Sequence, residues 1–217
     1  MSSNIINLLW ESFLETILMV GVSGGLGAAI GIPLGVFLFV TSPKGIMPKP
    51  YVNRIIGTVV NAVRSTPFII LLVAIIPFTR LIVGSSIGTV AAIVPLTIAA
   101  APPIARLVET SLREVDKGLI DAAQSLHATN TQIICKVLIP EAMPGILAGL
   151  TIAFVALVGS SAMAGAVGGG GLGDMGIRYG YQRFMPGVMA AVVIILLVFV
   201  QRLQSFGDRL VSSVSHR

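Results

Sequence analysis

The chain has 217 residues, of which 55% are hydrophobic and 11% are charged, and its formal net charge is +5. Soluble domains carry roughly 25% charged residues, and a soluble fold could not hide this much apolar surface from water. The composition therefore excludes a soluble globular protein and predicts an integral membrane protein. The basic residues lie between apolar runs, so the positive charge indicates orientation in a membrane and not nucleic-acid binding.

Charged residues divide the sequence into stretches of membrane-spanning length, which is roughly 17–25 residues. Uncharged stretches run between residues 15 and 44, 80 and 106, 141 and 174, and 183 and 202. A fifth span is expected at about 56–79, with Arg64 about two helical turns inside it. The sequence thus predicts an all-α bundle of five membrane-spanning helices, a single domain over 1–217 with its core at about 12–206.

The Lys and Arg residues fall unequally on the two sides of such a bundle. One side holds Lys44, Lys49, Arg54, Arg106, Arg113, Lys117, Lys136, Arg202, Arg209 and Arg217, and the other holds Arg80, Arg178 and Arg183. Cytoplasmic loops carry the excess of basic residues. We therefore expect the N-terminus outside the cell and the C-terminus in the cytoplasm.

Three glycines in the first span recur every four residues, at Gly27, Gly31 and Gly35. They lie on one face of a helix, where the absence of side chains allows another helix to approach closely. We expect this face to be a helix-packing surface, and it also favours a homodimer.

The segment 106–141 is the longest expected cytoplasmic loop and has an amphipathic pattern. Leu119, Ala122, Ala123 and Leu126 follow the i, i+3, i+4, i+7 spacing of one helix face. Thr129 followed by Gln132 is a capping-box pattern that would start a second helix. A helix–turn–helix of this kind suits docking into a partner protein, and the alternative is a helix lying on the lipid surface.

The same loop resembles the motif of bacterial ABC-importer permeases, which is Glu-Ala-Ala, three residues, Gly, nine residues and Ile-x-Leu-Pro. The matching positions here are Asp121-Ala122-Ala123, His127 and Val137-Leu138-Ile139-Pro140. Asp121 keeps the charge of the Glu. His127 replaces a Gly, and it is unfavourable there if the turn requires a positive φ.

The resemblance extends over nearly the whole chain to the methionine-importer permeases. It includes Arg64-Ser65-Thr66-Pro67-Phe68, Ile76-Pro77-Phe78-Thr79-Arg80, Ala92-Ile93-Val94-Pro95 and Gly165-Ala166-Val167-Gly168. It implies a type I ABC-importer permease that works as two copies with two cytoplasmic ATPases and an external binding lipoprotein, in a bacterial inner membrane. It also implies that Asp121, Ala122, Ala123, Leu126, His127 and Pro140 form the contact that couples transport to the ATPase.

Outside this loop, the sequence suggests two further sites. Gly168, Gly170 and Gly173 match Gly-x-Gly-x-x-Gly, but a long apolar span precedes them, so we interpret them as a flexible external loop. Our hypothesis is that Gly170 and Gly171, with Tyr179 and Tyr181, form the outer mouth and dock the binding protein.

A translocation pathway is suggested by Ser160, Ser161 and Met163, and by Arg64 as an ionisable residue inside a span. Packing by Met163, and snorkelling of Arg64 to the membrane surface, are the alternatives.

The chain has no Gly-x-x-x-x-Gly-Lys-Ser/Thr sequence, so we expect ATP and Mg²⁺ on the partner ATPase. No expected span contains a His or a carboxylate pair that could serve as a general base, so we expect no catalysis, cofactor or metal site in this chain. The alternatives are an importer permease for another amino acid or a quaternary ammonium compound, a carrier or channel without an ATPase, and a membrane scaffold.

Overall fold

The computed structural model describes residues 3–215, so Arg217, counted above among the cytoplasmic basic residues, lies outside them. Within this range most residues are helical and none is in a strand, which confirms the all-α prediction. The principal helices are α1 (Ser3–Val40), α2 (Pro50–Ser65), α3 (Phe68–Ala74), α4 (Ile76–Val83), α5 (Thr89–Arg113), α6 (Lys117–Ser125), α7 (Asn130–Ile133), α8 (Ile139–Ala164), α9 (Gly171–Met175) and α10 (Pro186–Val214). Three π-helical turns, η1 (Ile134–Leu138), η2 (Gly165–Gly169) and η3 (Gly176–Tyr181), complete them.

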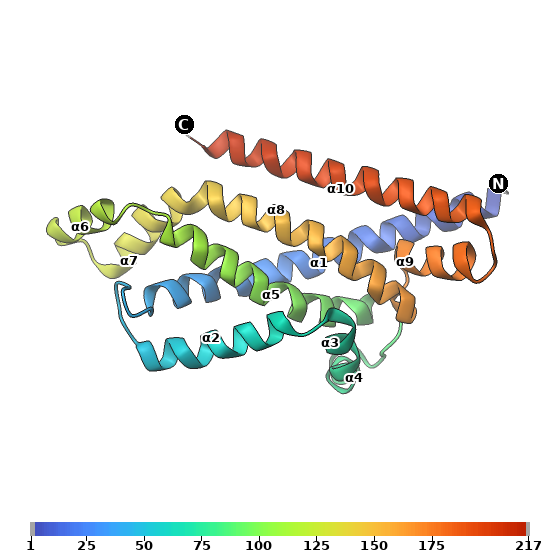
Figure 1. Ribbon diagram of the computed structural model, residues 1–217, viewed down its shortest axis with the longest axis horizontal. Coiled ribbons are helices and arrows are strands. Elements are labelled where there is room, and N and C mark those ends of the chain that lie inside the picture. The colour runs from blue at the N-terminus through green and yellow to red at the C-terminus, as the bar shows by residue number, and fades with distance from the viewer. Residues whose placement is uncertain (1–2, 216–217) are drawn as a thin grey trace.

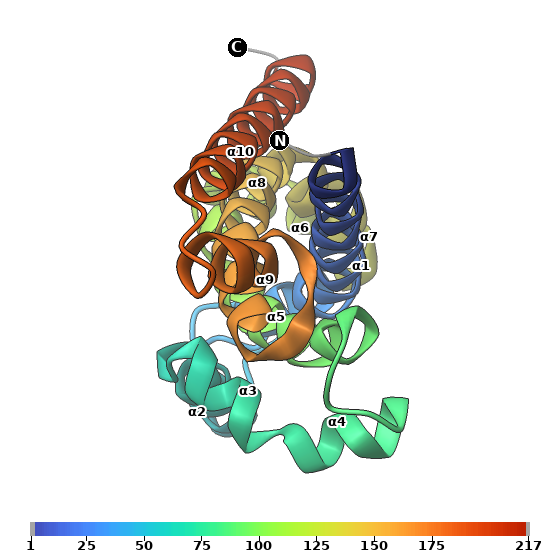
Figure 2. The same cartoon turned by 90° about the vertical axis from the view of Figure 1, so that its right-hand side faces the viewer.

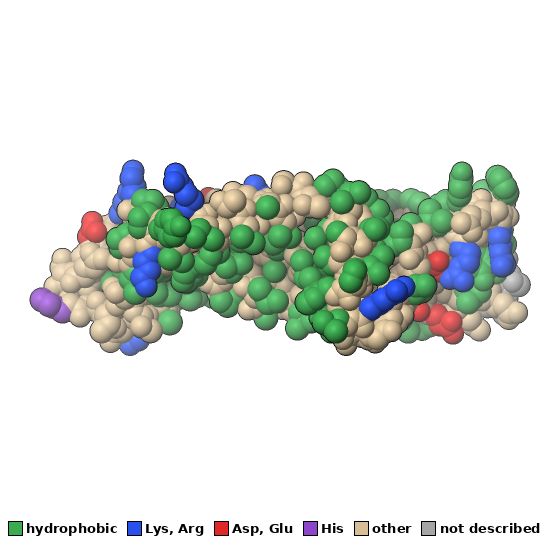
Figure 3. Space-filling view, turned by 90° about the horizontal axis from the view of Figure 1, so that it is seen from below, with side chains coloured by type: hydrophobic (Ala, Val, Ile, Leu, Met, Phe, Trp, Pro, Cys, Tyr) green, Lys and Arg blue, Asp and Glu red, His purple; other side chains and the backbone are tan. Residues whose placement is uncertain are grey.

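The long helices run side by side along the length of the molecule (Figure 1). Helices α1, α5, α8 and α10 are each long and apolar enough to cross a membrane, and the bent pair α2 and α3 is a fifth candidate. Charged side chains gather toward the two ends of the rod, with a largely apolar band between them (Figure 3). This arrangement agrees with five crossings.

The fifth span, expected at about 56–79, is present as a broken helix pair with other bounds. Helix α2 begins at Pro50 and ends at Ser65, and α3 leaves it at an angle of 106°. The break falls at Thr66 and Pro67, whose ψ angles are 126° and 133°, because a proline disfavours helical backbone in the residue before it. Arg64 consequently lies in the last turn of α2, beside the break, and not two turns inside a span.

The glycine face of α1 packs against α5 of the same chain. A Cβ atom at Gly27 would lie 2.7 Å from Cβ of Ala100, and one at Gly35 would lie 2.4 Å from the carbonyl oxygen of Ala105. Gly31 meets Ala101 and Ile104 in the same way. Because α5 occupies this face, it is closed to a second copy, and the expectation that it favours a homodimer is wrong.

The bundle has two distinct ends (Figures 1 and 2). Helices α6 and α7 lie at one end, with the α1–α2 connection and the C-terminal end of α10. The N-terminal end of α1, helix α4 and helix α9 lie at the other. Buried side chains such as Leu96, Ile104 and Leu157 form a continuous core between the ends.

Candidate functional site

The candidate coupling loop is a compact helical elbow. The expected loop 106–141 proves to be helical at both ends, since α5 continues to Arg113 and an unbroken helical segment resumes at Asn130. We call residues 114–129, which lie between these helices and include α6, the elbow. It projects beyond the end of the bundle (Figure 1).

Side-chain caps begin both helices of this region. The Asp116 carboxylate accepts a hydrogen bond from the backbone N–H of Gly118 at 2.6 Å and so caps α6. The Thr129 hydroxyl accepts from the N–H of Gln132, and the Gln132 side chain accepts from the N–H of Thr129. The predicted capping box is therefore present, and it begins α7.

The elbow turns part of its apolar surface to solvent. Ile120 and Ala123 pack against the core, whereas Asp121 and Ala122 are exposed. Leu126 is 83% exposed. Of the predicted apolar face, Leu119, Ala122 and Leu126 are thus exposed, whereas Ala123 helps to attach the elbow, beside Ile120, which was not predicted on that face. Pro140, also expected in this contact, is exposed in the first turn of α8.

His127 forms the turn between the two helices in a left-handed conformation, with φ of 58°. Its backbone N–H donates to the carbonyl oxygen of Gln124 at 2.9 Å. A non-glycine residue is disfavoured in this region. The turn therefore has the geometry that a glycine would suit, and His127 holds it under backbone strain.

At the opposite end, the glycine segment is a packed hairpin, contrary to the expectation of a flexible loop. The N–H of Gly171 donates to the Glu15 carboxylate at 2.6 Å, and the N–H of Leu172 donates to the Thr16 hydroxyl at 2.9 Å. Gly170 and Gly171 have φ of 78° and 75°, which explains the need for glycine.

The two predicted tyrosines differ in their surroundings. The ring of Tyr179 lies 4.5 Å from the guanidinium of Arg183, and Tyr181 is 69% exposed. Phe184, which the sequence did not suggest, is 85% exposed with φ of 51°. An exposed aromatic surface therefore lies beyond the hairpin.

The proposed pathway residues do not converge. Ser161 is 1% exposed and donates to the carbonyl oxygen of Val158, so its hydroxyl is turned into the bundle. Met163 is 53% exposed on another face of α8, Ser160 bonds to Ala156 within the helix, and Arg64 belongs to α2. One chain therefore gathers no polar site from these four residues.

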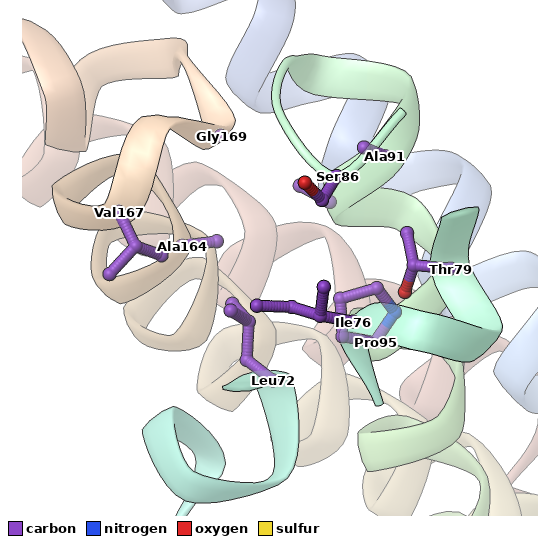
Figure 4. Close-up of a pocket in the computed structure, with 10 residues that line it drawn as sticks. Leu72, Ile76, Thr79, Ser86, Ala91, Pro95, Ala164, Val167 and Gly169 are labelled. Atoms are coloured by element: carbon purple, nitrogen blue, oxygen red, sulfur yellow. The ribbon is translucent and has the colours of Figure 1, made fainter. Parts of the chain in front are cut away.

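Met163 instead belongs to an uncovered stripe along α8, which we call the α8 stripe. Ile152, Ala156, Gly159 and Met163 follow helical spacing, and the exposed Val167, which lies beyond α8 in the kinked turn η2, continues the stripe. A cavity of about 20 Å³ lies nearby, between Leu72, Ile76, Pro95, Ala164 and Val167 (Figure 4). This cavity has room for about one water molecule, so it cannot hold an amino acid.

Sequence reasoning missed two polar networks. Glu15 and Thr16 were placed at the margin of the first span because charges were taken as its limits, whereas α1 begins at Ser3 and includes them. The same rule placed Arg106 in a loop. In the structure Arg106 and Arg113 both bond to Glu109, at the i−3 and i+4 positions of one helix face. That spacing is the signal that could have revealed them.

These features define a multi-pass membrane protein with a helical elbow that projects from one end. The chain matches the family described as "Binding-protein-dependent transport system inner membrane component" over residues 31–216, and it belongs to that family. It is accordingly a multi-pass protein of the bacterial inner membrane.

The chain is similar to named methionine-transport proteins over nearly its whole length. The chain is 56% identical over 211 residues to the probable D-methionine transport system permease protein MetI of Vibrio cholerae, covering 97% of this chain and 94% of that one. It is 43% identical over 209 residues to the methionine import system permease protein MetP of Bacillus subtilis, covering 96% and 94%. An inward-facing structure of the MetNI methionine ABC transporter matches all of both chains at 50% identity, with a TM-score of 0.98.

Proposed function

We propose that this chain is the permease subunit of an ATP-driven importer that carries D- and L-methionine across the inner membrane. Two copies form the pathway, two cytoplasmic ATPases power it, and an external lipoprotein delivers the solute. The observation that carries the proposal is the exposed apolar surface of the elbow, where Leu119, Ala122 and Leu126 face solvent. The charged side chain of Asp121 lies exposed beside it. An apolar helix face of this kind suits a groove on a partner protein.

The substrate assignment is supported by the relatives, which are named for methionine transport and share 43–56% of their residues with this chain. We place the pathway between two copies because the cavity beside the α8 stripe has only about 20 Å³. The larger hollow of the chain, about 620 Å³, lies at the elbow end and is lined by Glu114, Asp116 and Glu141. In this arrangement the α8 stripe lines the passage, and the flexible, polarizable side chain of Met163 contacts the apolar part of the solute. Arg64, Ser160 and Ser161 have no direct contact with the solute in this proposal.

Charge reversal in the elbow tests the coupling contact. In Asp121→Arg, we expect recovery of the co-purified ATPase to fall at least tenfold, because the new charge opposes a surface that accepts a carboxylate. Asp208→Arg is the matched control, since Asp208 is an exposed acidic residue near the C-terminal end of α10. Equal recovery of the ATPase with both variants would contradict the proposal and favour a carrier or scaffold.

Uptake measurements test the substrate. Vesicles that contain the assembled complex should accumulate radiolabelled methionine, with competition by both stereoisomers and not by a quaternary ammonium compound. Met163→Ala should reduce uptake while leaving ATPase association intact, and Ile194→Ala, at an exposed position of α10, is its control. Competition by other solutes alone would assign the permease to another substrate.

The outer mouth is the remaining part of the proposal. The hairpin at Gly170 and Gly171, with Tyr179 and Tyr181 beyond it, provides the docking surface for the binding lipoprotein. Bulky substitutions at either glycine should impair uptake, because a side chain at Gly171 would meet Met19 and Thr16. Unchanged uptake in these variants would exclude the hairpin from the mouth.

A further inference from the structure

The last turns of α5 contain a buried charge network that the proposed transport cycle does not yet use. The Glu109 side chain is 5% exposed, and its two carboxylate oxygens each lie 2.6 Å from a guanidinium nitrogen, one from Arg106 and one from Arg113. Because a buried carboxylate is costly without partners, the two arginines fix its position. The three side chains therefore form a rigid unit on one face of α5.

Arg106 extends this unit to a second helix. Its Nη2 donates to the carbonyl oxygen of Gly57 in α2 at 3.0 Å, while its Nη1 holds Glu109. A planar guanidinium can make both bonds at once, which an ammonium group cannot do in the same geometry. Gly57 is buried, and a Cβ atom there would lie 3.2 Å from the same Nη2. Glycine thus leaves the guanidinium its space.

Helix α2 has few other attachments to the bundle. Gly57 and Val60 are its buried residues. One turn before Gly57, the Asn53 amide donates to the carbonyl oxygen of Leu38 at 2.6 Å and to the Thr41 hydroxyl at 3.0 Å, at the end of α1. Within residues 3–215, the polar contact that joins α2 to α5 is the bond from Arg106 to Gly57.

The network also lies directly before the elbow. Arg113 is the last residue of α5, and α6 begins at Lys117. The connection between them is short and includes the buried side chain of Val115. The connection is short and packed against the bundle, so we expect a displacement of α6 to move Arg113 as well.

We propose that Arg106, Glu109 and Gly57 form a rigid link that transmits the displacement of the elbow to α2. Arg106 and Glu109 are accordingly positioning residues for coupled transport, and this inference rests on the proposed function above. While the two Arg106 bonds persist, α2 must follow α5 as one body. Without them, α5 can move with the ATPase while α2 remains in place, so ATP is hydrolysed without moving solute.

The first test compares uptake with hydrolysis in vesicles containing the assembled complex. Arg106→Lys keeps the charge but cannot bridge Glu109 and Gly57, so radiolabelled methionine taken up per ATP hydrolysed should fall about tenfold. Arg54→Lys, the same exchange at an exposed position of α2, should keep the wild-type ratio. A merely structural contact would reduce uptake and hydrolysis in proportion and leave the ratio of uptake to hydrolysis unchanged. An unchanged ratio in Arg106→Lys therefore overturns the link.

Gly57→Val provides a second variant if Arg106→Lys does not assemble. It preserves every charge, and its branched side chain crowds the guanidinium more than a single Cβ atom, which would lie 3.2 Å from Nη2, so it should lower the same ratio. A ratio equal to that of the wild type in this variant also overturns the proposal.

The second test measures movement directly. In a Cys135→Ser background, a spin label on Val59→Cys reports on α2 and one on Lys117→Cys reports on α6, each as a distance across the pair of copies. Between nucleotide-free and ATP-trapped complexes, both distances should change in the wild type, and only the α6 distance should change in Arg106→Lys. If both still change, the link does not transmit motion. If the α6 distance is the same in nucleotide-free and ATP-trapped complexes even with Arg106 in place, the proposed function fails instead.

Discussion

His127 holds the turn of the elbow in a conformation that suits glycine, with φ of 58°. Left-handed backbone costs a non-glycine residue roughly 1–2 kcal/mol. Replacing His127 by glycine removes this strain, but it also makes the unfolded chain more flexible, which offsets about 0.4–1 kcal/mol of the gain. We expect His127→Gly to stabilise the protein by about 0.5–1 kcal/mol, measured by thermal unfolding in detergent. His127→Ala keeps a Cβ atom and should bring no such gain, so equal stability of the two variants would contradict the strain.

Glu15 is predicted to hold the glycine hairpin at the other end. A hydrogen bond from a backbone N–H to a charged group contributes roughly 1.5–3 kcal/mol, so Glu15→Ala should accelerate amide exchange in residues 168–172 by about 10–100-fold. Glu11→Ala, one turn earlier at an exposed position, should leave that exchange unchanged. Equal protection of the hairpin in both variants would show that the carboxylate is dispensable.

These two residues differ in what their sequence reveals. The geometry of His127 follows from its place in a spaced motif, because a turn that usually takes glycine commonly requires a positive φ. The bond from Glu15 joins residues 156 positions apart. No local pattern records such a contact, so only the fold reveals it.

At the scale of elements, the approach of α1 to α5 is set by glycine. A Cβ atom at position 35 would lie 2.4 Å from a backbone oxygen of α5, whereas one at Gly25 meets nothing within 4 Å. We expect Gly35→Ala to destabilise the bundle by about 1–3 kcal/mol, because the helices must separate. Gly25→Ala should be neutral or stabilising by up to about 1 kcal/mol. The measurement is the free energy of unfolding of each variant in detergent. Equal values for Gly35→Ala and Gly25→Ala would contradict this packing.

The elements that the sequence predicted best are those with strong periodicity or caps, such as the glycine face and the Thr129–Gln132 box. The placement of Glu15 at the margin of the first span and the placement of Arg106 in a loop are errors with one cause. Both treated charged residues as markers of helix ends. Arg106 and Glu109 lie inside α5 because pairing compensates their burial. Pro67 indicates a bend or a helix end, but hydropathy continues across it, so the size of the bend, 106°, follows only from the backbone geometry.

On the scale of the whole molecule, the fold supports the division of basic residues made from sequence. The α1–α2 connection, the elbow and the C-terminal end of α10 share one end of the bundle, although they are distant in the chain (Figure 1). These segments carry Lys44, Lys117 and Arg209, among others. From the excess of Lys and Arg at this end, we predict that it faces the cytoplasm.

The single cysteine provides a direct test of this orientation. Cys135 is exposed and lies in η1, close to the elbow. With the chain expressed without an ATPase, a membrane-impermeant maleimide should label Cys135 in inverted inner-membrane vesicles and not in intact spheroplasts. Tyr181→Cys in a Cys135→Ser background should show the opposite pattern, because Tyr181 lies exposed near the hairpin end. Labelling of Cys135 from the outside would reverse the topology and remove the elbow from reach of any cytoplasmic ATPase.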